Sequence, residues 1–380
     1  MRRALPTIAT LAILVVGCAS PVPTGKPPGS SIAPSAATSP APSADAPTPT
    51  GTPITGQLAY VAGMGDPQIF LLDLATGESR QLTNLRPEDA ELTSEGPLRP
   101  ALTCGFGPYS LTWSPDGSQL AFTYGSCDTV LFVVSADGNL RRIGDGRGPT
   151  WSPDGSRLIY GSNVPYMPCA DCQDPGPGEL ELRIVDIAGG GEPAPFTADG
   201  STSLGGSPSF SPDGAMVAFS GPPQGGDAQA FSATYLIGSD GTGARLIANG
   251  GYPAGWLPDG RLLISRGAEG SVHAVDIDSG ESEQVGAAQT VSVSPDGSRS
   301  LAWTSDPASG AQVLQLLTAA GELVGEAPGS FGAWSPDARA FAVFGNDGGL
   351  HLVSRDGELL ASYEIRPVGG PASAAWRPGS

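Results

Sequence analysis

A short motif that recurs along the chain constrains its fold more than any other sequence feature. In its commonest form the motif is Trp-Ser-Pro-Asp-Gly. Copies begin at Trp113, Trp151, Phe210, Trp256, Val293 and Trp334, and a shortened copy begins at Trp376. Proline presets φ for the first turn position, aspartate hydrogen-bonds to nearby backbone, and glycine adopts the left-handed conformation. The chain is therefore expected to make the same tight turn many times.

The spacing of the motif is that of a β-propeller. Successive copies begin 38, 59, 46, 37, 41 and 42 residues apart, and a four-stranded propeller blade takes about 40–45 residues. Short apolar strands follow the copies, for example at residues 120–122 and 217–219, and a second strand and another turn come next. The chain has 55 Gly and 38 Pro among 380 residues, which disfavours long helices. We therefore expect an all-β fold of four-stranded blades.

The two ends of the repeat region complement each other. The last copy, Trp376–Ser380, lacks the strand that should follow it. In contrast, Gln57–Tyr60 matches Gln119–Phe122 but lacks the motif that should precede it. The C-terminal strand is thus predicted to complete the N-terminal blade and to close the ring at seven blades. Closure would hide sheet edges that could otherwise pair with other chains.

We interpret the motif residues as structural. Five of the six Trp in the chain occupy the first motif position, where an aromatic ring would fill the space between adjacent blades. The matching Asp residues are interpreted as turn formers, and no metal site is predicted. This structural set comprises Trp113, Asp116, Trp151, Asp154, Phe210, Asp213, Trp256, Asp259, Asp296, Trp334, Asp337 and Trp376.

On these motifs, residues 57–380 resemble the TolB-type, WD-like propeller repeat family. That family is related to the propeller of prolyl-oligopeptidase-type peptidases. The resemblance implies a propeller fold over the whole of this region.

The N-terminus predicts export and lipid anchoring. Two arginines precede an apolar stretch at residues 4–17, which is too short to cross a hydrocarbon core of about 30 Å. The end of this stretch, Val-Val-Gly-Cys18, resembles a bacterial lipobox. The resemblance implies that residues 1–17 are a signal peptide and that Cys18 receives the lipid. The alternative is a plain secretory signal with an incidental Cys18.

Residues 18–56 are rich in Pro, Ser, Thr and Ala and contain no aromatic residue. Such a segment cannot bury enough apolar area to offset ordering entropy, so we expect the lipidated Cys18 to be followed by a disordered tether. The propeller would then occupy residues 57–380. The predicted location is the outer face of the cytoplasmic membrane, or the periplasm or outer membrane if the cell is diderm.

Charge limits the partners. The formal net charge is −19, which argues against nucleic acid or an anionic membrane surface as the main partner. Contact with the membrane is instead expected through the lipid anchor. The protein is expected to be a monomer, and no cofactor is predicted.

The four remaining cysteines are predicted to form disulfides in an oxidising compartment. Cys104 and Cys127 are equidistant from the turn Ser114–Gly117, so a regular hairpin would set them opposite each other. Cys169 and Cys172 form a Cys-x-x-Cys pair in a loop rich in Pro and Gly. This context favours a loop staple, with a redox pair or half of a zinc site as alternatives.

Candidates for catalysis are few. The sequence contains no Gly-x-Ser-x-Gly nucleophile elbow and only two histidines. Both histidines occupy one position of a repeated strand and are interpreted as variable strand residues. The residues aligned at that position are Phe70, Phe132, Arg183, Tyr235, His273, Gln315 and His351. No catalytic residue is predicted.

Long loops indicate a binding face. In a propeller, the loops between the second and third strands share one face with the connections between blades. That face receives residues 83–109, 163–178, 197–207 and 221–229. Long irregular loops on rigid scaffolds often carry function, although neutral insertion is the alternative for any single loop. The candidate binding residues are Glu88, Asp89, Glu91, Glu95, Asp128, Tyr166, Asp171 and Asp174.

The resulting expectation is a non-catalytic, membrane-anchored extracytoplasmic propeller that binds a protein, peptide or glycan through its long-loop face. The alternative is a propeller enzyme, a hydrolase or lyase, with its site at the mouth of the central channel.

Overall fold

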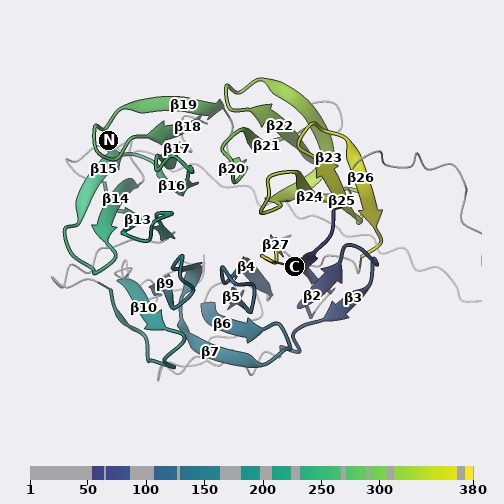
Figure 1. The fold of residues 1–380 in the computed structure, drawn as a ribbon, viewed down its shortest axis with the longest axis horizontal. Helices are drawn as coiled ribbons and strands as arrows, with labels where there is room; N and C mark the ends of the chain where they lie inside the picture. Colours follow the sequence, from purple (N-terminus) through teal and green to yellow (C-terminus); the bar gives the residue numbers. More distant parts are fainter. Residues whose placement is uncertain are drawn as a thin grey trace, which may run out of the picture. The chain divides into compact units, whose positions relative to one another are not determined.

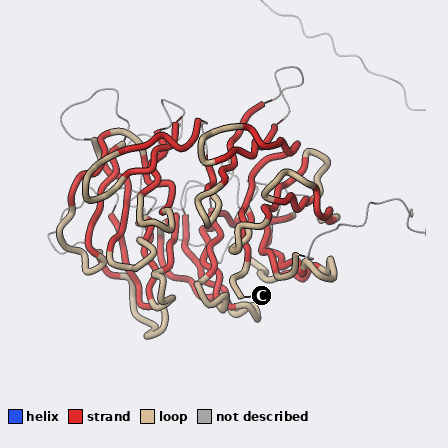
Figure 2. Tube along the Cα trace, turned by 45° about the horizontal axis from the view of Figure 1, so that its top comes forward, coloured by secondary structure: helices blue, strands red, loops and turns tan. Residues whose placement is uncertain are grey.

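The described part of the chain consists of strands joined by turns. The computed structural model describes residues 54–63, 66–85, 107–125, 129–162, 181–196, 208–223, 232–266, 271–287, 291–305, 312–365 and 373–379. None of these residues is helical (Figure 2), which confirms the all-β prediction. Accordingly, these ranges offer no helix with the length and apolar character needed to cross a membrane. The signal peptide, Cys18 and most of the tether lie outside them.

The described strands form six antiparallel sheets, which follow one another around a common centre (Figure 1). The sheet that joins the chain ends contains β27 (Ala374–Trp376), β1 (Gln57–Ala62), β2 (Gln68–Asp73) and β3 (Ser79–Gln81). The next contains β4 (Pro108–Trp113), β5 (Gln119–Gly125), β6 (Thr129–Ser135) and β7 (Leu140–Asp145). It is followed by β8 (Arg147–Trp151), β9 (Arg157–Ser162), β10 (Glu181–Asp186) and β11 (Ala194–Pro195).

Two further four-stranded sheets follow in the chain. One contains β12 (Ser209–Phe210), β13 (Met216–Gly221), β14 (Ala233–Gly238) and β15 (Arg245–Asn249). The other contains β16 (Tyr252–Trp256), β17 (Leu262–Arg266), β18 (Ser271–Val275) and β19 (Ser282–Ala287).

The last sheet has seven strands because one long strand is shared. It contains β20 (Val291–Val293), β21 (Arg299–Ser305), β22 (Gln312–Thr318), β23 (Leu323–Trp334), β24 (Ala340–Gly345), β25 (Leu350–Ser354) and β26 (Leu359–Tyr363). The first half of β23 pairs with β22 and its second half pairs with β24. The strand therefore ends one repeat and begins the next.

The chain ends meet in one sheet, as the sequence predicts. Strand β27 pairs with β1 so that Trp376 lies opposite Leu58 and Ala374 lies opposite Tyr60. Arg377 continues the contact: its backbone N–H donates to the carbonyl of Gln57 at 2.8 Å. The C-terminal strand thus completes the N-terminal sheet.

The core lies between neighbouring sheets. Successive side chains of a strand point to opposite faces, so one strand contributes to two apolar clusters. Tyr60 of β1 belongs to a buried cluster with Phe344 of β24, whereas the next residue, Val61, belongs to a cluster with Trp113 of β4. Burial on both faces explains why these strands are apolar at nearly every position.

The motif tryptophans connect consecutive sheets through their ring nitrogens. Each indole N–H donates to the carbonyl of the residue just before the motif in the previous copy. The bonds run from Trp113 to Ala375 (3.1 Å), Trp151 to Thr112 (3.1 Å), Trp256 to Ser209 (3.2 Å), Trp334 to Ser292 (3.2 Å) and Trp376 to Ala333 (2.7 Å). Phe210 and Val293 have no ring N–H and cannot make this bond. The tryptophan position therefore supplies a polar contact as well as apolar packing.

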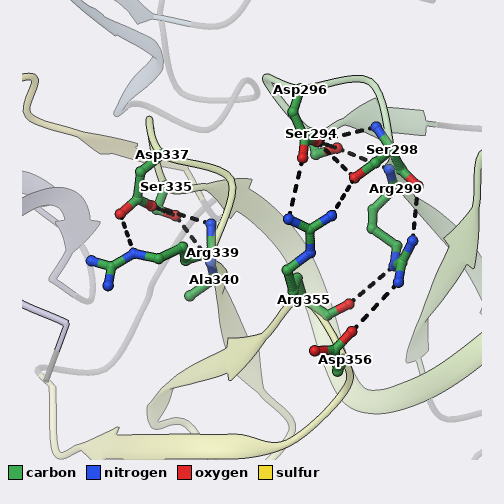
Figure 3. A network of polar contacts seen from close by, with 10 residues as sticks. All are labelled: Ser294, Asp296, Ser298, Arg299, Ser335, Asp337, Arg339, Ala340, Arg355 and Asp356. Atoms are coloured by element: carbon green, nitrogen blue, oxygen red, sulfur yellow. Dashed lines mark hydrogen bonds and ion pairs between the residues drawn. The ribbon is translucent and has the colours of Figure 1, made fainter. Parts of the chain in front are cut away.

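The motif turns are held by side chains of the motif itself (Figure 3). The hydroxyl of Ser294 donates to the Asp296 carboxylate at 2.7 Å, and this carboxylate accepts the backbone N–H of Ser298 at 3.1 Å. Arg355, from the turn after β25, donates to the Ser298 hydroxyl at 2.7 Å and pairs with Asp296 at 3.3 Å. The turn chemistry thus extends into contacts between repeats.

The register of the β4–β5 hairpin differs from the expected one. A regular hairpin about Ser114–Gly117 would place Trp113 opposite Ser118, but Trp113 lies opposite Leu120. The turn is wider because the Ser114 hydroxyl accepts the backbone N–H of Gln119 at 3.0 Å. The register shifts again between Tyr109 and Thr112. The premise that set Cys104 opposite Cys127 is therefore wrong, and both cysteines lie outside the described residues.

Candidate ligand-binding cleft

The predicted loop residues cannot be placed. Cys169, Cys172 and all candidate binding residues between Glu88 and Asp174 lie outside the described residues. The motif residues, in contrast, are described. Trp113, Trp151, Trp334 and Trp376 are buried, and the motif Asp residues lie in turns and accept local hydrogen bonds.

A polar cleft lies where β7 of one sheet meets β9 and β10 of the next. Its volume is about 340 Å³. It extends from the connection after β10 to Asp145 and Ser162, which end β7 and β9. Its lining consists of Arg142, Ile143, Gly144, Asp145, Tyr160, Ser162, Arg183, Glu192 and Pro193. Most of these side chains can donate or accept hydrogen bonds.

Two glycines of the chain shape the wall around Tyr160. A Cβ atom at Gly144 would lie 2.9 Å from the Tyr160 hydroxyl oxygen, and one at Gly146 would lie 2.5 Å from Cδ2 of its ring. Only glycine lets the backbone after β7 approach the phenol so closely. Tyr160 is 1% exposed and lines the cleft.

Charged groups of both signs surround this phenol. Burial raises the pKa of Tyr160 to about 12; Arg183 and Arg142 oppose this effect, whereas Asp145 and Glu181 add to it. Arg142 pairs with Asp145 at 2.5 Å. Arg183 donates to one oxygen of Glu181 through Nε at 3.3 Å and through Nη2 at 3.2 Å. Each guanidinium is therefore held in place by a carboxylate.

One donor of this cluster is left over. Nε of Arg142 is buried and has no hydrogen-bond partner among the described residues. Native proteins rarely leave a buried polar atom unpaired, because doing so costs about 1–3 kcal/mol. A ligand or water in the cleft would satisfy this donor.

The outer strand β11 of the cleft's sheet is short within the described residues. Strand β11 has two residues and pairs with β10 only at Arg183 and Ile184. The equivalent strand β7 has six residues and pairs with β6 from Val130 to Val134. Among the described residues, Glu181 at the start of β10 has no register partner on β11.

The cleft lies where a long connection leaves and re-enters the sheet. Strand β9 ends at Ser162, β10 begins at Glu181, and these two residues are register partners. Residues 163–180, which join them, include the loop that the sequence marks as part of a binding face.

A comparison among the repeats singles out Arg183. In three sheets the equivalent register pair is aromatic: Tyr60 with Phe70, Phe122 with Phe132, and Phe219 with Tyr235. The last two pairs are stacked, with ring centroids 5.6 and 5.5 Å apart. In the sheet of the cleft, Tyr160 is paired with Arg183 instead. The sequence aligned Arg183 with these aromatics, but interpreting the position as merely variable missed its charge.

The two histidines form hydrogen-bonded chains with neighbouring side chains. His351 contacts the Ser362 hydroxyl through Nδ1 at 2.8 Å and Asp347 through Nε2 at 3.0 Å. His273 contacts Ser282 through Nδ1 and Ser271 through Nε2, both at 3.1 Å. Both chains link the third and fourth strands of a repeat. No group of metal-binding side chains occurs among the residues that the structure describes.

The chain is similar in structure to several known proteins. No family model matches the chain, and no match is found among curated proteins. Oligogalacturonate lyase, solved in complex with manganese, is similar over 76% of this chain and 82% of its own, with a TM-score of 0.54 and 20% identity. A prolyl endopeptidase matches 85% of this chain and 50% of its own, with a TM-score of 0.52 and 16% identity. TolB from Acinetobacter baumannii matches 84% of this chain and 82% of its own, with a TM-score of 0.48 and 17% identity.

At these identities the likeness concerns the fold alone. It supports a β-propeller, the fold class that the repeats predict. The similar structures include both a lyase and a peptidase, so the fold does not decide the activity of this chain.

Proposed function

We propose that this protein is an extracytoplasmic propeller lipoprotein that binds a protein, peptide or glycan without transforming it. The observation that carries the binding role is the polar cleft beside Tyr160. It joins an unpaired buried donor, two guanidinium–carboxylate pairs and both ends of the segment 163–180. Sites of this kind, concave and lined by convergent polar groups, are where propeller scaffolds can hold a ligand.

We propose a closed ring of seven blades as the scaffold. The first strands of the repeats contact one another in the order β27, β4, β8, β12, β16, β20 and β23, and β23 in turn contacts β27. The indole bonds from Trp113 to Ala375 and from Trp376 to Ala333 support closure across the chain ends. A closed ring would keep the cleft rigid, because neither neighbouring sheet would have a free inner edge.

Capture experiments test the binding role. The full mature chain, immobilised, would be exposed to envelope extracts and to peptide and glycan arrays. Variants would have residues 163–178 or residues 83–105 shortened. We expect the first variant to lose its ligand, because this segment leaves and re-enters at the cleft. If both variants retain every ligand of the unaltered chain, the long-loop face is not the binding face.

The anchor is tested separately. Cys18→Ser removes the thiol that a lipobox would lipidate, so the protein should move from the membrane pellet to the soluble fraction after fractionation. An Ala19→Ser variant serves as the control, because it leaves the lipobox intact. Membrane retention of Cys18→Ser at the level of the control would contradict lipid anchoring.

A second candidate function is hydrolysis. It is favoured by the chain of Ser362, His351 and Asp347, since a serine, a base and a carboxylate in hydrogen-bond contact are the elements of nucleophilic catalysis. This cluster lies on β25, β26 and the turn before β25, away from the channel mouth named in the sequence-based alternative. A fluorophosphonate probe would label Ser362 if the serine is activated, and Ser362→Ala would abolish the label. Unlabelled protein would argue against this candidate.

A further inference from the structure

We propose that the cleft between β7 and β9–β10 recognises an uncharged carbohydrate through its hydroxyl groups. This inference rests on the proposed binding function and specifies its ligand class. It starts from the type of polar group that the cleft presents.

The side chains that line the cleft offer both hydrogen-bond donors and hydrogen-bond acceptors. Arg142 supplies a buried N–H that has no partner within the described part of the chain, and Asp145 beside it supplies carboxylate oxygens. Arg183, the Tyr160 hydroxyl and the Ser162 hydroxyl add groups on the opposite wall. A sugar hydroxyl both donates and accepts a hydrogen bond. Neighbouring hydroxyls can therefore bond to a guanidinium and its paired carboxylate at once.

The charges of the cleft and of the whole chain disfavour an ionic ligand. Each guanidinium is already paired with a carboxylate, and Glu192 adds a further negative group to the lining. An anion would find no net positive charge, and it would approach a chain with a formal net charge of −19. A cation would meet two guanidinium groups at close range. A neutral polyol bears neither cost.

The cleft also differs from a peptide groove. Grooves that bind amphipathic helices or Pro-rich segments are lined by apolar or aromatic side chains. In this cleft Ile143, Pro193 and Tyr160 are the apolar and aromatic lining side chains, and the others are polar or charged. Its volume of about 340 Å³ lies at the lower end of the roughly 300–1,000 Å³ of small-ligand sites. It therefore suits the end of an oligosaccharide.

The aromatic pairs of the other repeats provide the test variant. Arg183→Phe restores the pair found as Phe122 with Phe132, so the sheet should still fold while the cleft loses a guanidinium. Gln315→Phe introduces the same side chain at the equivalent position of another repeat, where Gln315 lies opposite Ala302 and donates to Glu326 at 2.9 Å. It serves as the matched control.

The experiment is calorimetric titration of the full mature chain with neutral trisaccharides (cellotriose, chitotriose and mannotriose) and with trigalacturonate. Peptide binding is measured separately on peptide arrays. We expect at least one neutral trisaccharide to bind. Arg183→Phe should weaken this binding about ten-fold or more, because hydrogen bonds to charged groups are stronger than those between neutral groups. Gln315→Phe should leave it unchanged. Affinity should change little between low and high ionic strength, because the ligand carries no charge.

A second variant tests the same cleft by shape. Gly144→Ala would push a methyl group to 2.9 Å from the Tyr160 hydroxyl oxygen, so the phenol must move and binding should weaken. Thermal melts report whether each variant is folded. If Arg183→Phe does not fold, Arg183→Gln and Gly144→Ala carry the test.

Four outcomes would overturn the inference. One is binding of trigalacturonate or of peptides, but of no neutral trisaccharide. Another is neutral-sugar binding that folded Arg183→Phe and Gly144→Ala both retain. Peptide capture that depends on residues 163–178 would remove the carbohydrate inference and leave the binding function standing. Loss of all binding, to every probe, would remove both.

Discussion

At the scale of the residue, the motif glycines serve two separate purposes. Gly117 has φ +68°, a conformation that side chains rarely adopt, and a Cβ there would lie 2.4 Å from the carbonyl oxygen of Pro378. Gly260 occupies the same motif position with φ +87°, but nothing lies within 4 Å of its Cβ direction. One glycine is needed for backbone conformation and for space, the other for conformation alone.

This difference predicts unequal effects of the same substitution. Gly260→Ala should lower the free energy of unfolding by about 1–2 kcal/mol, the cost of a left-handed alanine. Gly117→Ala should cost more, because the methyl group also collides with the C-terminal segment. Urea denaturation of both variants measures the difference. Equal losses would show that the contact with Pro378 is not important for stability.

At the scale of the element, a tryptophan ties strand β27 to the neighbouring repeat. Trp376 is 8% exposed, and its indole N–H donates to the carbonyl of Ala333 in the shared strand β23 at 2.7 Å. The strand itself pairs with β1 over only three residues. The contact with β23 is therefore a large part of what holds the C-terminal strand.

Trp376→Phe keeps an aromatic ring but removes the donor and leaves the Ala333 carbonyl without this bond. We expect the free energy of unfolding to fall by about 1–3 kcal/mol, and the amides of β1 to exchange faster in hydrogen-exchange measurements. Trp303→Phe is the control, because Trp303 lies outside the motif and is 41% exposed. A loss no greater than that of the control would contradict the role given to the indole bond.

At the scale of the whole molecule, the repeated turn aspartates couple stability to acid. Hydrogen bonds from Ser152 and from Ser156 lower the pKa of Asp154 from 3.8 to about 2. Burial raises the pKa of Asp296, but hydrogen bonds from Ser294 and Ser298 outweigh it and bring the value to about 2. Asp116, Asp213, Asp259 and Asp337 are shifted in the same direction.

A carboxyl group whose pKa is lower in the folded state than in the unfolded state stabilises the fold at any pH above its unfolded-state pKa. This stabilisation is lost as the pH falls through the folded-state pKa. Stability should therefore hold from neutral pH to about 4 and decline between about 4 and 2. Thermal melts across this range measure the decline. The stability of Asp154→Asn should decline less steeply with falling pH than that of the unaltered chain. The control, Asp278→Asn, should decline as steeply as the unaltered chain. Parallel curves for all three proteins would contradict the linkage.

Much of the fold could be predicted because the motif acts locally. Pro, Asp and Gly within five residues fix a turn whatever surrounds it, and an apolar strand beside it can be recognised from its own residues. The same repetition allowed His351 and Arg183 to be aligned with Phe132, and the strand registers agree with that alignment. The pairing of β27 with β1 followed from the complementary ends.

What the sequence could not decide was which repeat position carries chemistry. The hairpin register of β4 and β5 was missed because the Ser114 side chain widens the turn, an effect that counting from its centre ignores. The aligned Arg183 could be taken as a variable strand residue because Arg142 and Asp145, which line the same cleft, belong to another sheet.

The repeated turn, the apolar strands and the meeting of the chain ends follow from the sequence, since each depends on residues close together or on plain complementarity. The cleft does not follow from it. Arg142 and Tyr160 reach one cleft only through the packing of two sheets. The depth and exposure of such a cleft depend on where the strands of two neighbouring sheets end, and no single segment of the sequence encodes this.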